Sequence, residues 1–239
     1  MKYFSQHTGI NISFDSCELL TGGNLHQAVE NHVELIDLSY QDYIELKKEI
    51  TIESVSVFQV GYADALVWLN GKYQFTSLNQ NAFLSLLSNS HDYLRTDLNA
   101  VIVGSEETVL SFVPVLAQVG FKNFLVSVEN TELGQDLVDK LLKIYLGLDI
   151  QLISYKQVNQ IESISSFLVI DFDHQKYKEI SQALSYFNFL APQSLFFDLQ
   201  SSKYLELKDE ALRAHLHCLD ADTFFRNRVS LALELVKNR

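Results

Sequence analysis

The second half of the chain alternates between short apolar runs and amphipathic stretches, and this alternation limits the possible fold more than any other feature. The apolar runs are Ala100–Val103, Phe124–Val128, Gln151–Ser154, Phe167–Ile170 and Leu195–Asp198. Segments with helical periodicity lie between them, at Thr108–Val119, Glu132–Leu146 (with Thr131 as the expected N-cap), Tyr177–Tyr186 and Asp209–His215. Strands that are apolar on both sides and separated by helices are typical of a parallel sheet covered on both faces. The sequence therefore predicts an α/β fold.

The first half predicts shorter elements of the same two kinds. Asn70-Gly71 separates two apolar runs, and this pair accepts the positive φ values of a tight hairpin turn. We expect a strand at Val33–Leu38, helices at Tyr40–Ile50 and Asn81–Leu87, and a last helix at Ala221–Lys237. Two domains are predicted, residues 1–90 and 98–220, with the last helix packing back on the first domain.

Composition excludes several classes of function. The chain has 30 acidic against 18 basic side chains, a net charge of -12. This acidic excess repels phosphate, so we expect neither nucleic acid nor a membrane surface as a partner. No signal peptide is evident, and the apolar runs are shorter than a membrane helix, so a cytoplasmic protein is expected. Cys17 and Cys218 have no metal-ligand spacing; we expect buried thiols, with a disulfide left open.

Several stretches, in the same order and with similar spacing, resemble the shikimate dehydrogenase family. They are Val60–Val67 with Asn70–Lys72 and Ser77–Leu84, Ala100–Thr108 with Val115–Gly120, Leu195–Asp198, and Leu219–Glu234. The resemblance covers nearly the whole chain. It implies two α/β domains: a C-terminal Rossmann-like parallel sheet with helices on both faces, and an N-terminal substrate domain that is shortened here.

The positions that resemble the family's catalytic pair differ in this chain. The family's lysine lies in an NVTIPHK segment before the stretch that resembles Val60–Val67. Only Thr51–Gln59 separates that stretch from the predicted helix before it, and this segment contains no lysine. The aspartate that partners the lysine falls on Asn79, which has no titratable group. The proton shuttle that this chemistry needs is therefore missing.

The positions that resemble substrate-binding residues are changed as well. The family's asparagine falls on Asp64, its serine pair on Ser13 and Asp15, and its substrate-holding glutamine on Arg228. Asp64 and Asp15 bring negative charge to the place of an anionic substrate. Arg228 is expected either to hold a carboxylate or to pair with these aspartates.

The positions that resemble the nucleotide site have become acidic. A diphosphate needs glycines and a helix N-terminus, but Gly104 is followed by Ser105, Glu106 and Glu107. A like-charge pair near 4 Å costs about 4 kcal/mol at an effective dielectric of ~20, and a few kcal/mol removes two or more orders of magnitude of affinity. Glu106 and Glu107 are also expected to cap the helix. Four more positions resemble the family's nucleotide-binding residues: Glu129, Asn130, Thr131 and Asp171. The first three stand where the family has the arginine that selects NADP, and none of them is an arginine.

Three further groups of residues are candidates for a metal site or a protein-binding surface. His215, His217 and Cys218, with Asp220 and Asp222, are interpreted as a polar sheet edge and not as a metal site. Asp171-Phe172-Asp173-His174, at the end of a predicted strand, resembles acidic sites that bind Mg²⁺, and this alternative is left open. The aromatic groups Tyr186–Leu190 and Phe224-Phe225 are candidates for a surface that binds another protein.

The leading hypothesis is a shikimate-dehydrogenase-like pseudoenzyme that binds a protein or a small anionic or polyol ligand, with no cofactor and no metal. The alternative is a divergent dehydrogenase that uses NAD or NADP on shikimate, quinate or a relative. A third hypothesis is a regulator whose acidic edge binds a basic protein through Glu106, Glu107, Asp171 and Asp173. A homodimer is compatible with each.

Overall fold

The computed structural model describes residues 2–4, 18–20, 25–158, 160–171, 187–200 and 206–237. The chain divides into two units, one made of Met1–Ala82 with Phe225–Arg239 and the other of Phe83–Phe224. Across the described residues, no helix combines the length and the apolar character needed to cross a bilayer.

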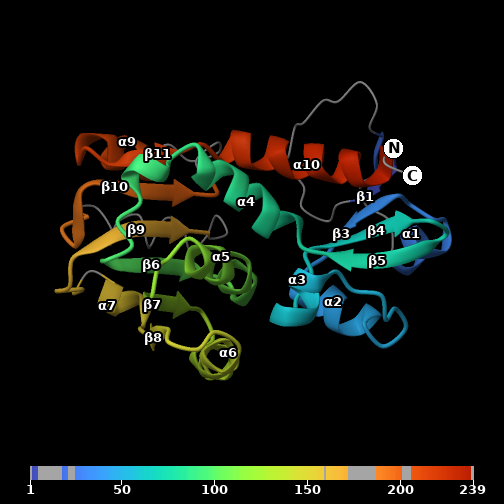
Figure 1. Cartoon of the computed structure of the whole chain (residues 1–239), viewed down its shortest axis with the longest axis horizontal. Helices are drawn as coiled ribbons and strands as arrows, with labels where there is room; N and C mark the ends of the chain where they lie inside the picture. Colours follow the sequence, from blue (N-terminus) through green and yellow to red (C-terminus); the bar gives the residue numbers. More distant parts are fainter. Residues whose placement is uncertain are drawn as a thin grey trace. The chain divides into compact units, whose positions relative to one another are not determined.

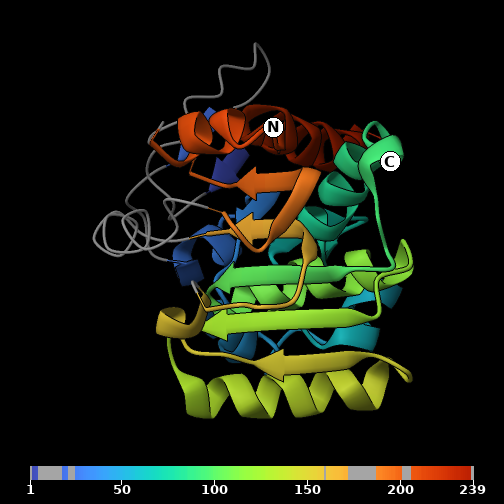
Figure 2. The same ribbon diagram turned by 90° about the vertical axis from the view of Figure 1, so that its left-hand side faces the viewer.

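The unit Phe83–Phe224 is built on a six-stranded sheet with the order β11-β10-β9-β6-β7-β8. Every neighbouring pair in it is parallel, and the arrowheads of β6, β7 and β8 point the same way in Figure 2. From β8 to β11, this is the 3-2-1-4-5-6 order of dinucleotide-binding sheets, which reverses between β6 and β9. The strands are β6 (Asn99–Gly104), β7 (Asn123–Val128), β8 (Asp149–Leu152), β9 (Ser165–Ile170), β10 (Leu190–Asp198) and β11 (His217–Leu219).

Helices cover both faces of this sheet, as predicted (Figure 1). Phe196 of β10 lies in a buried cluster with residues of α7 and α9. Phe197, its neighbour on the other face, lies 5.8 Å from Phe112 of α5 and 5.5 Å from Phe83, between ring centroids. The helices are α4 (Leu78–Ser88), a 3₁₀ turn (His91–Tyr93), α5 (Glu106–Gln118), α6 (Thr131–Ile144), α7 (Tyr155–Val158), α9 (Glu206–Arg213) and the start of α10 (Ala221–Lys237).

The other unit has a five-stranded mixed sheet with the order β2-β1-β3-β4-β5. The β1 strand is parallel to β2 and β3, whereas β3, β4 and β5 are antiparallel neighbours. The predicted hairpin is confirmed: Leu69 pairs with Lys72, and Asn70 and Gly71 have φ values of 50° and 78°. The strands are β1 (Lys2–Phe4), β2 (Glu18–Leu20), β3 (Leu35–Asp37), β4 (Ala65–Leu69) and β5 (Lys72–Thr76).

Short helices and the last helix complete this unit. Ala232 of α10 packs in a buried cluster with Leu35, Ala65 and Val67 of the sheet. Tyr43 of α2 is fully buried and meets Phe75 edge to face, with ring centroids 5.1 Å apart. The helices here are α1 (Leu25–Glu30), α2 (Tyr40–Leu46) and α3 (Val55–Val60).

Some local predictions were wrong. The helix predicted at Tyr40–Ile50 ends at Leu46, and Ile44, expected on its buried side, is 40% exposed. The helix α3 occupies residues that were expected only as a spacer. The N-cap of α6 is Asn130, whose Oδ1 accepts hydrogen bonds from the amides of Glu132 and Leu133, and not Thr131. The helix predicted at Tyr177–Tyr186 lies outside the described residues.

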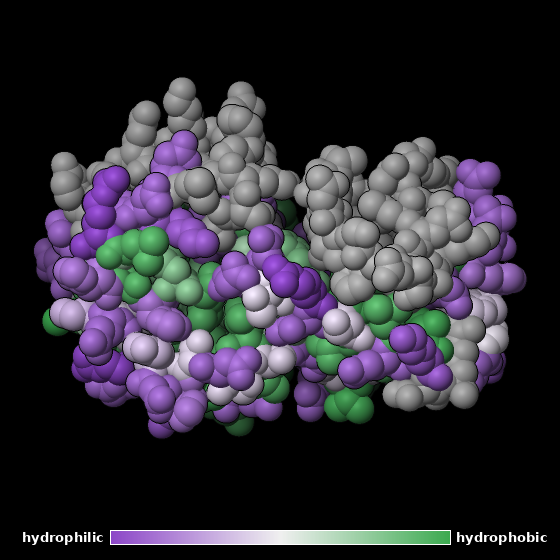
Figure 3. Space-filling model, turned by 90° about the horizontal axis from the view of Figure 1, so that it is seen from above, coloured by the Kyte–Doolittle hydropathy of each residue, from purple (hydrophilic) through white to green (hydrophobic). Residues whose placement is uncertain are grey.

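The aromatic groups considered as a binding surface are mostly core. Phe187, Phe189 and Phe224 are 4%, 6% and 1% exposed, because each fills a buried cluster of its unit. In the view of Figure 3, hydrophilic residues make up most of the described surface, and apolar residues form separate groups between them. Cys218 is a free, half-buried thiol whose pKa is raised by burial, and Cys17 lies outside the described residues.

Candidate functional site

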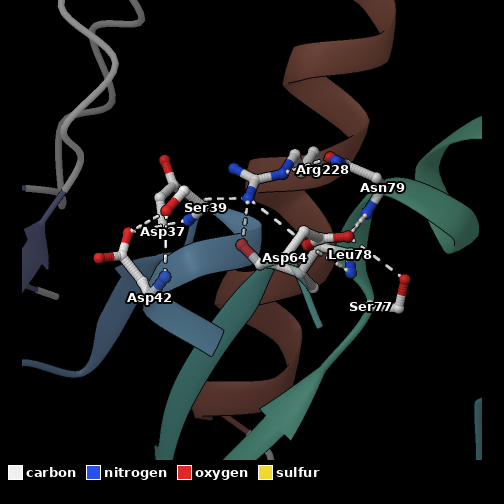
Figure 4. A network of polar contacts seen from close by, with 8 residues as sticks. All are labelled: Asp37, Ser39, Asp42, Asp64, Ser77, Leu78, Asn79 and Arg228. Carbon is white, nitrogen blue, oxygen red and sulfur yellow. Dashed lines mark hydrogen bonds and ion pairs between the residues drawn. The ribbon is translucent and has the colours of Figure 1, made fainter. Parts of the chain in front are cut away.

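Arg228 lies at the centre of a buried polar network in the first unit (Figure 4). Its Nη2 atom lies 2.6 Å from Oδ1 of Asp37 and 3.5 Å from Oδ1 of Asp64. The same nitrogen donates a hydrogen bond to the backbone oxygen of Asp64 at 3.2 Å, and Nε donates one to Oδ1 of Asn79 at 2.8 Å. Of the two outcomes expected for Arg228, the structure has the pairing with aspartate.

Asp64 binds the first turn of α4. Its carboxylate accepts hydrogen bonds from the amides of Leu78 and Asn79, both at 2.9 Å, and from the hydroxyl of Ser77 at 3.2 Å. These amides belong to the helix end that carries partial positive charge, so a carboxylate is well placed there. The position that resembles the family's substrate-binding asparagine therefore acts here as a helix cap supplied by a neighbouring strand.

The three charged side chains around Arg228 are buried. The side chains of Asp37, Asp64 and Arg228 are 3%, 2% and 7% exposed. Burial raises the pKa of Asp64, and the nearby Asp37 carboxylate adds to this rise; Arg228 and the amides of Asn79 and Leu78 oppose it. The Nε and Nη2 atoms of Arg228 are thus directed at groups of the protein itself.

No lysine takes part in this network, as far as the described residues show. The strand β3 leads directly into α2 at Ser39, where Ser39 and Asp42 form a reciprocal capping box. The first lysine after β3 is Lys47, whose Nζ donates to the hydroxyl of Tyr43 at 2.7 Å and lies 3.0 Å from Glu53. The stretch from β3 through α2 contains no lysine, and neither does Thr51–Gln59.

The turn after β6 is closed by its own side chains. Ser105 is the N-cap of α5: its Oγ accepts the amide of Thr108 at 3.3 Å, and the Ser105 amide donates to Thr108 Oγ1 at 3.3 Å. Thr108 Oγ1 also donates to Oδ2 of Asp171 at 2.9 Å. The capping residue is therefore Ser105, and Glu106 and Glu107 lie in the first turn after it.

Gly104 is required by this packing. A Cβ atom built on Gly104 would lie 2.8 Å from Thr108 Oγ1 and 2.9 Å from the backbone oxygen of Asp171. The space that a glycine leaves for a diphosphate in dinucleotide-binding turns is filled here by Thr108 and Asp171. Together with the carboxylates of Glu106 and Glu107, this filling does not fit a diphosphate.

The remaining acidic equivalents lie at the carboxyl ends of the parallel strands, which meet at one edge of the sheet. Glu129 follows β7 and is exposed, while Asp171 follows β9 and accepts a hydrogen bond from Gln200 at 3.4 Å. Asp198 ends β10, is 1% exposed, and accepts the amide of Gln200 at 2.9 Å. Open α/β sheets bind ligands along this edge, and here it is acidic.

The structure does not support the metal interpretations within its described part. His215 has φ 58° and precedes β11, so it does not share a strand face with His217, whose ring stacks on Tyr93 at 4.0 Å. The described residues contain no group of His, Cys, Asp and Glu side chains that could hold a metal ion. Ser13, Asp15, Asp173 and His174 lie outside the described residues.

Sequence reasoning missed two residues of these sites. Asp37 is the closest partner of Arg228, and Thr108 is the residue that fills the turn after β6. A lone aspartate at the end of the apolar run Leu35–Asp37 was a possible signal for the first. Thr108 gave none, because its contacts depend on Asp171, which is distant in sequence.

By sequence, the chain matches no family model and no curated protein. Its structure is similar to shikimate 5-dehydrogenase from Listeria monocytogenes, solved with shikimate and NAD, with a TM-score of 0.74 and 14% identity over 93% of this chain and 81% of that one. Quinate dehydrogenase from Corynebacterium glutamicum, solved with NAD, has a TM-score of 0.74 and 12% identity, over 100% of this chain and 93% of that one. 5-Ketofructose reductase of Gluconobacter sp. strain CHM43 has a TM-score of 0.65 and 9% identity, over 93% of this chain and 83% of that one. The sequence resemblance is thus confirmed at the level of the fold: this chain has the two-domain fold of the shikimate and quinate dehydrogenases.

Proposed function

We propose that this chain is a shikimate-dehydrogenase-like protein without dehydrogenase activity, which acts by binding a protein or a small anionic or polyol ligand. The observation that carries the proposal is the pairing of Arg228 with Asp37 and Asp64 at 2.6 and 3.5 Å. Of the positions that resemble the family's substrate-binding residues, Asp64 and Arg228 pair with each other, and their side chains are 2% and 7% exposed.

The chemistry of the site supports the same conclusion. Oxidation of a hydroxyl group needs a residue that takes up its proton. Asn79 cannot do so, and its Oδ1 accepts a hydrogen bond from Arg228. The carboxylate of Asp64 accepts hydrogen bonds from the amides of Leu78 and Asn79.

The nucleotide side supports it independently. Ser105, Thr108 and Asp171 fill the turn after β6, and two carboxylates stand in the first turn of α5. The proposal therefore needs neither NAD nor NADP, and no step of it passes through them.

A turnover assay tests the proposal. Shikimate or quinate is mixed with NAD or NADP and the purified protein, with the Listeria monocytogenes enzyme as a positive control. We expect no substrate-dependent reduction of either nucleotide above the rate without protein. Reduction that depends on both this protein and the substrate would overturn the proposal.

A divergent dehydrogenase is the second candidate, and Glu129 favours it. This exposed carboxylate follows the second strand of the Rossmann order, where NAD-binding sheets carry an acidic residue that binds the ribose. A thermal shift with NAD or NADP that is lost in Glu129→Gln, but kept in the matched Glu132→Gln variant, would support it. No shift with either nucleotide would exclude it.

The acidic edge favours a basic protein as the partner. We propose a cytoplasmic location, and a homodimer is compatible with this function. Glu106, Glu107 and Asp171 lie near the carboxyl ends of β6 and β9, and Asp173 follows them in sequence. Reversing all four charges to lysine should abolish binding of an identified basic partner. Binding that survives this reversal would remove the edge from the proposal.

A further inference from the structure

The buried network has an unbalanced charge. Within the part of the chain that the structure describes, it contains one guanidinium and two carboxylates, all at least nine-tenths buried, and these three groups carry one net negative charge when both aspartates are ionised. The two carboxylates approach the same nitrogen, Nη2 of Arg228. Keeping two carboxylates ionised beside one guanidinium in a buried site is costly, and a proton that neutralises one of them relieves the cost.

The network also joins two helices. Asp64 holds the first turn of α4 through Leu78 and Asn79, and Arg228 projects from α10 to both Asp64 and Asn79. These are the two helices within which the chain passes from one unit to the other, after Ala82 and after Phe224. A change of charge in the network therefore acts on both of these helices.

We propose that Asp37, Asp64 and Arg228 form a proton-responsive clamp, which holds α4 and α10 most tightly when the cluster carries one proton and loosens the first turn of α4 when that proton is lost. The protonated cluster is neutral, with Asp37 and Arg228 as its ion pair. The deprotonated cluster buries a second carboxylate, and the described groups that stabilise it are the amides of Leu78 and Asn79, the hydroxyl of Ser77 and the shared guanidinium. The clamp does not depend on whether the chain binds a nucleotide.

The groups that face Asp64 set the direction of the response. Arg228 from α10 and Asp37 from β3 are the charged side chains that act on it among the described residues, and α4 contributes the amides of Leu78 and Asn79. Asp42 of α2 accepts hydrogen bonds from Ser39 within its own capping box. Because burial raises the pKa of Asp64 in the folded state, the folded state holds this proton at a pH where the opened state has lost it. Opening of the clamp is therefore favoured as the pH rises from the ordinary aspartate range to the raised pKa.

Amide hydrogen exchange of Leu78 and Asn79, read by NMR across this pH range, tests the proposal. After correction for the intrinsic exchange rate, we expect the opening constant of these amides to rise by up to tenfold per pH unit and then to level off. In the Asp64→Asn variant the constant should not change with pH. The matched Asp42→Asn variant changes an aspartate in another helix's capping box, and it should keep the wild-type dependence.

An opening constant that is flat in the wild type, or that changes equally in Asp64→Asn, would overturn the proposal. If Asp64→Asn does not fold, the carboxyl carbon of Asp64 is titrated in the wild-type protein. Titration above the ordinary aspartate range supports the clamp, and titration within or below that range rejects it.

Discussion

The Nε atom of Arg228 donates a hydrogen bond to Oδ1 of Asn79 at 2.8 Å, although the two residues are 149 positions apart in sequence. They stand at the positions that resemble the family's substrate-holding glutamine and the aspartate that partners its lysine. Two side chains that would serve the substrate in such a site bind each other here. This hydrogen bond and the ion pairs of Arg228 connect α10 to α4 and to β3, so these side chains contribute to the packing of the unit.

Replacing Arg228 by methionine should strongly destabilise the protein. The change keeps an unbranched apolar stem but leaves Asp37 and Asp64 buried without the Arg228 guanidinium, which costs about 3–5 kcal/mol. Urea unfolding at neutral pH measures this loss. The control is Arg226→Met, an exposed residue on the same helix, which should change the free energy of unfolding by less than about 0.5 kcal/mol. Equal effects of the two variants would show that the buried network contributes little.

Replacing Gly104 by alanine should destabilise the protein by about 1–3 kcal/mol. The new Cβ would meet Thr108 Oγ1 at 2.8 Å and the backbone oxygen of Asp171 at 2.9 Å, and the backbone oxygen cannot move aside cheaply. Thermal or urea unfolding measures the effect. A variant as stable as the wild type that has lost a measurable affinity for nucleotide would instead assign this glycine to a diphosphate site.

Replacing both Glu106 and Glu107 by glutamine should increase any affinity for NADP by at least about tenfold. Two carboxylates in the first turn of α5 oppose a diphosphate at the end of the helix that otherwise attracts anions. Calorimetry at low salt compares the variant with the wild type, and the same pair of measurements at high salt should show a smaller difference. A decrease in affinity would mean that these side chains contact the nucleotide favourably.

Tyr73 should make the protein sensitive to alkaline pH. Burial raises the pKa of Tyr73, and its hydroxyl donates to the backbone oxygen of Val33 at 3.0 Å. Since the folded state holds this proton more tightly, its stabilising contribution is present below the ordinary tyrosine pKa of about 10 and is lost as the pH rises above it. Tyr73→Phe should cost about 1 kcal/mol at neutral pH, and its difference from the wild type should shrink above pH ~10. Tyr93→Phe, on a more exposed ring, serves as the control in urea unfolding.

Local signals in the sequence predicted much of the fold. The strands of the parallel sheet are apolar on both sides, and Asn70-Gly71 specifies a hairpin turn, so both were predictable from short segments. Helix α3 was not, because Val55-Ser56-Val57 alternates with the period of a strand. The bridge between Glu53, just before the helix, and Phe75 of the sheet forms only in the folded chain.

The candidate sites were predicted less completely, for a related physical reason. Arg228, Asp64 and Asn79 were each predicted as site positions, and pairing of Arg228 with Asp64 was one of two outcomes expected, whereas its hydrogen bond to Asn79 was not predicted. Asp37 was not named, because only the register of β3 against β4 places it beside Asp64. Thr108 likewise depends on β9 lying next to β6, which brings Asp171 to it.

Calorimetric titration of the wild-type protein with NADP in the presence of saturating shikimate, repeated with NAD, tests most directly whether the chain's own side chains have taken over both sites. We predict no saturable heat at nucleotide concentrations up to about 1 mM, which corresponds to a binding free energy weaker than about -4 kcal/mol. A single saturable site with micromolar affinity for either nucleotide would contradict this account.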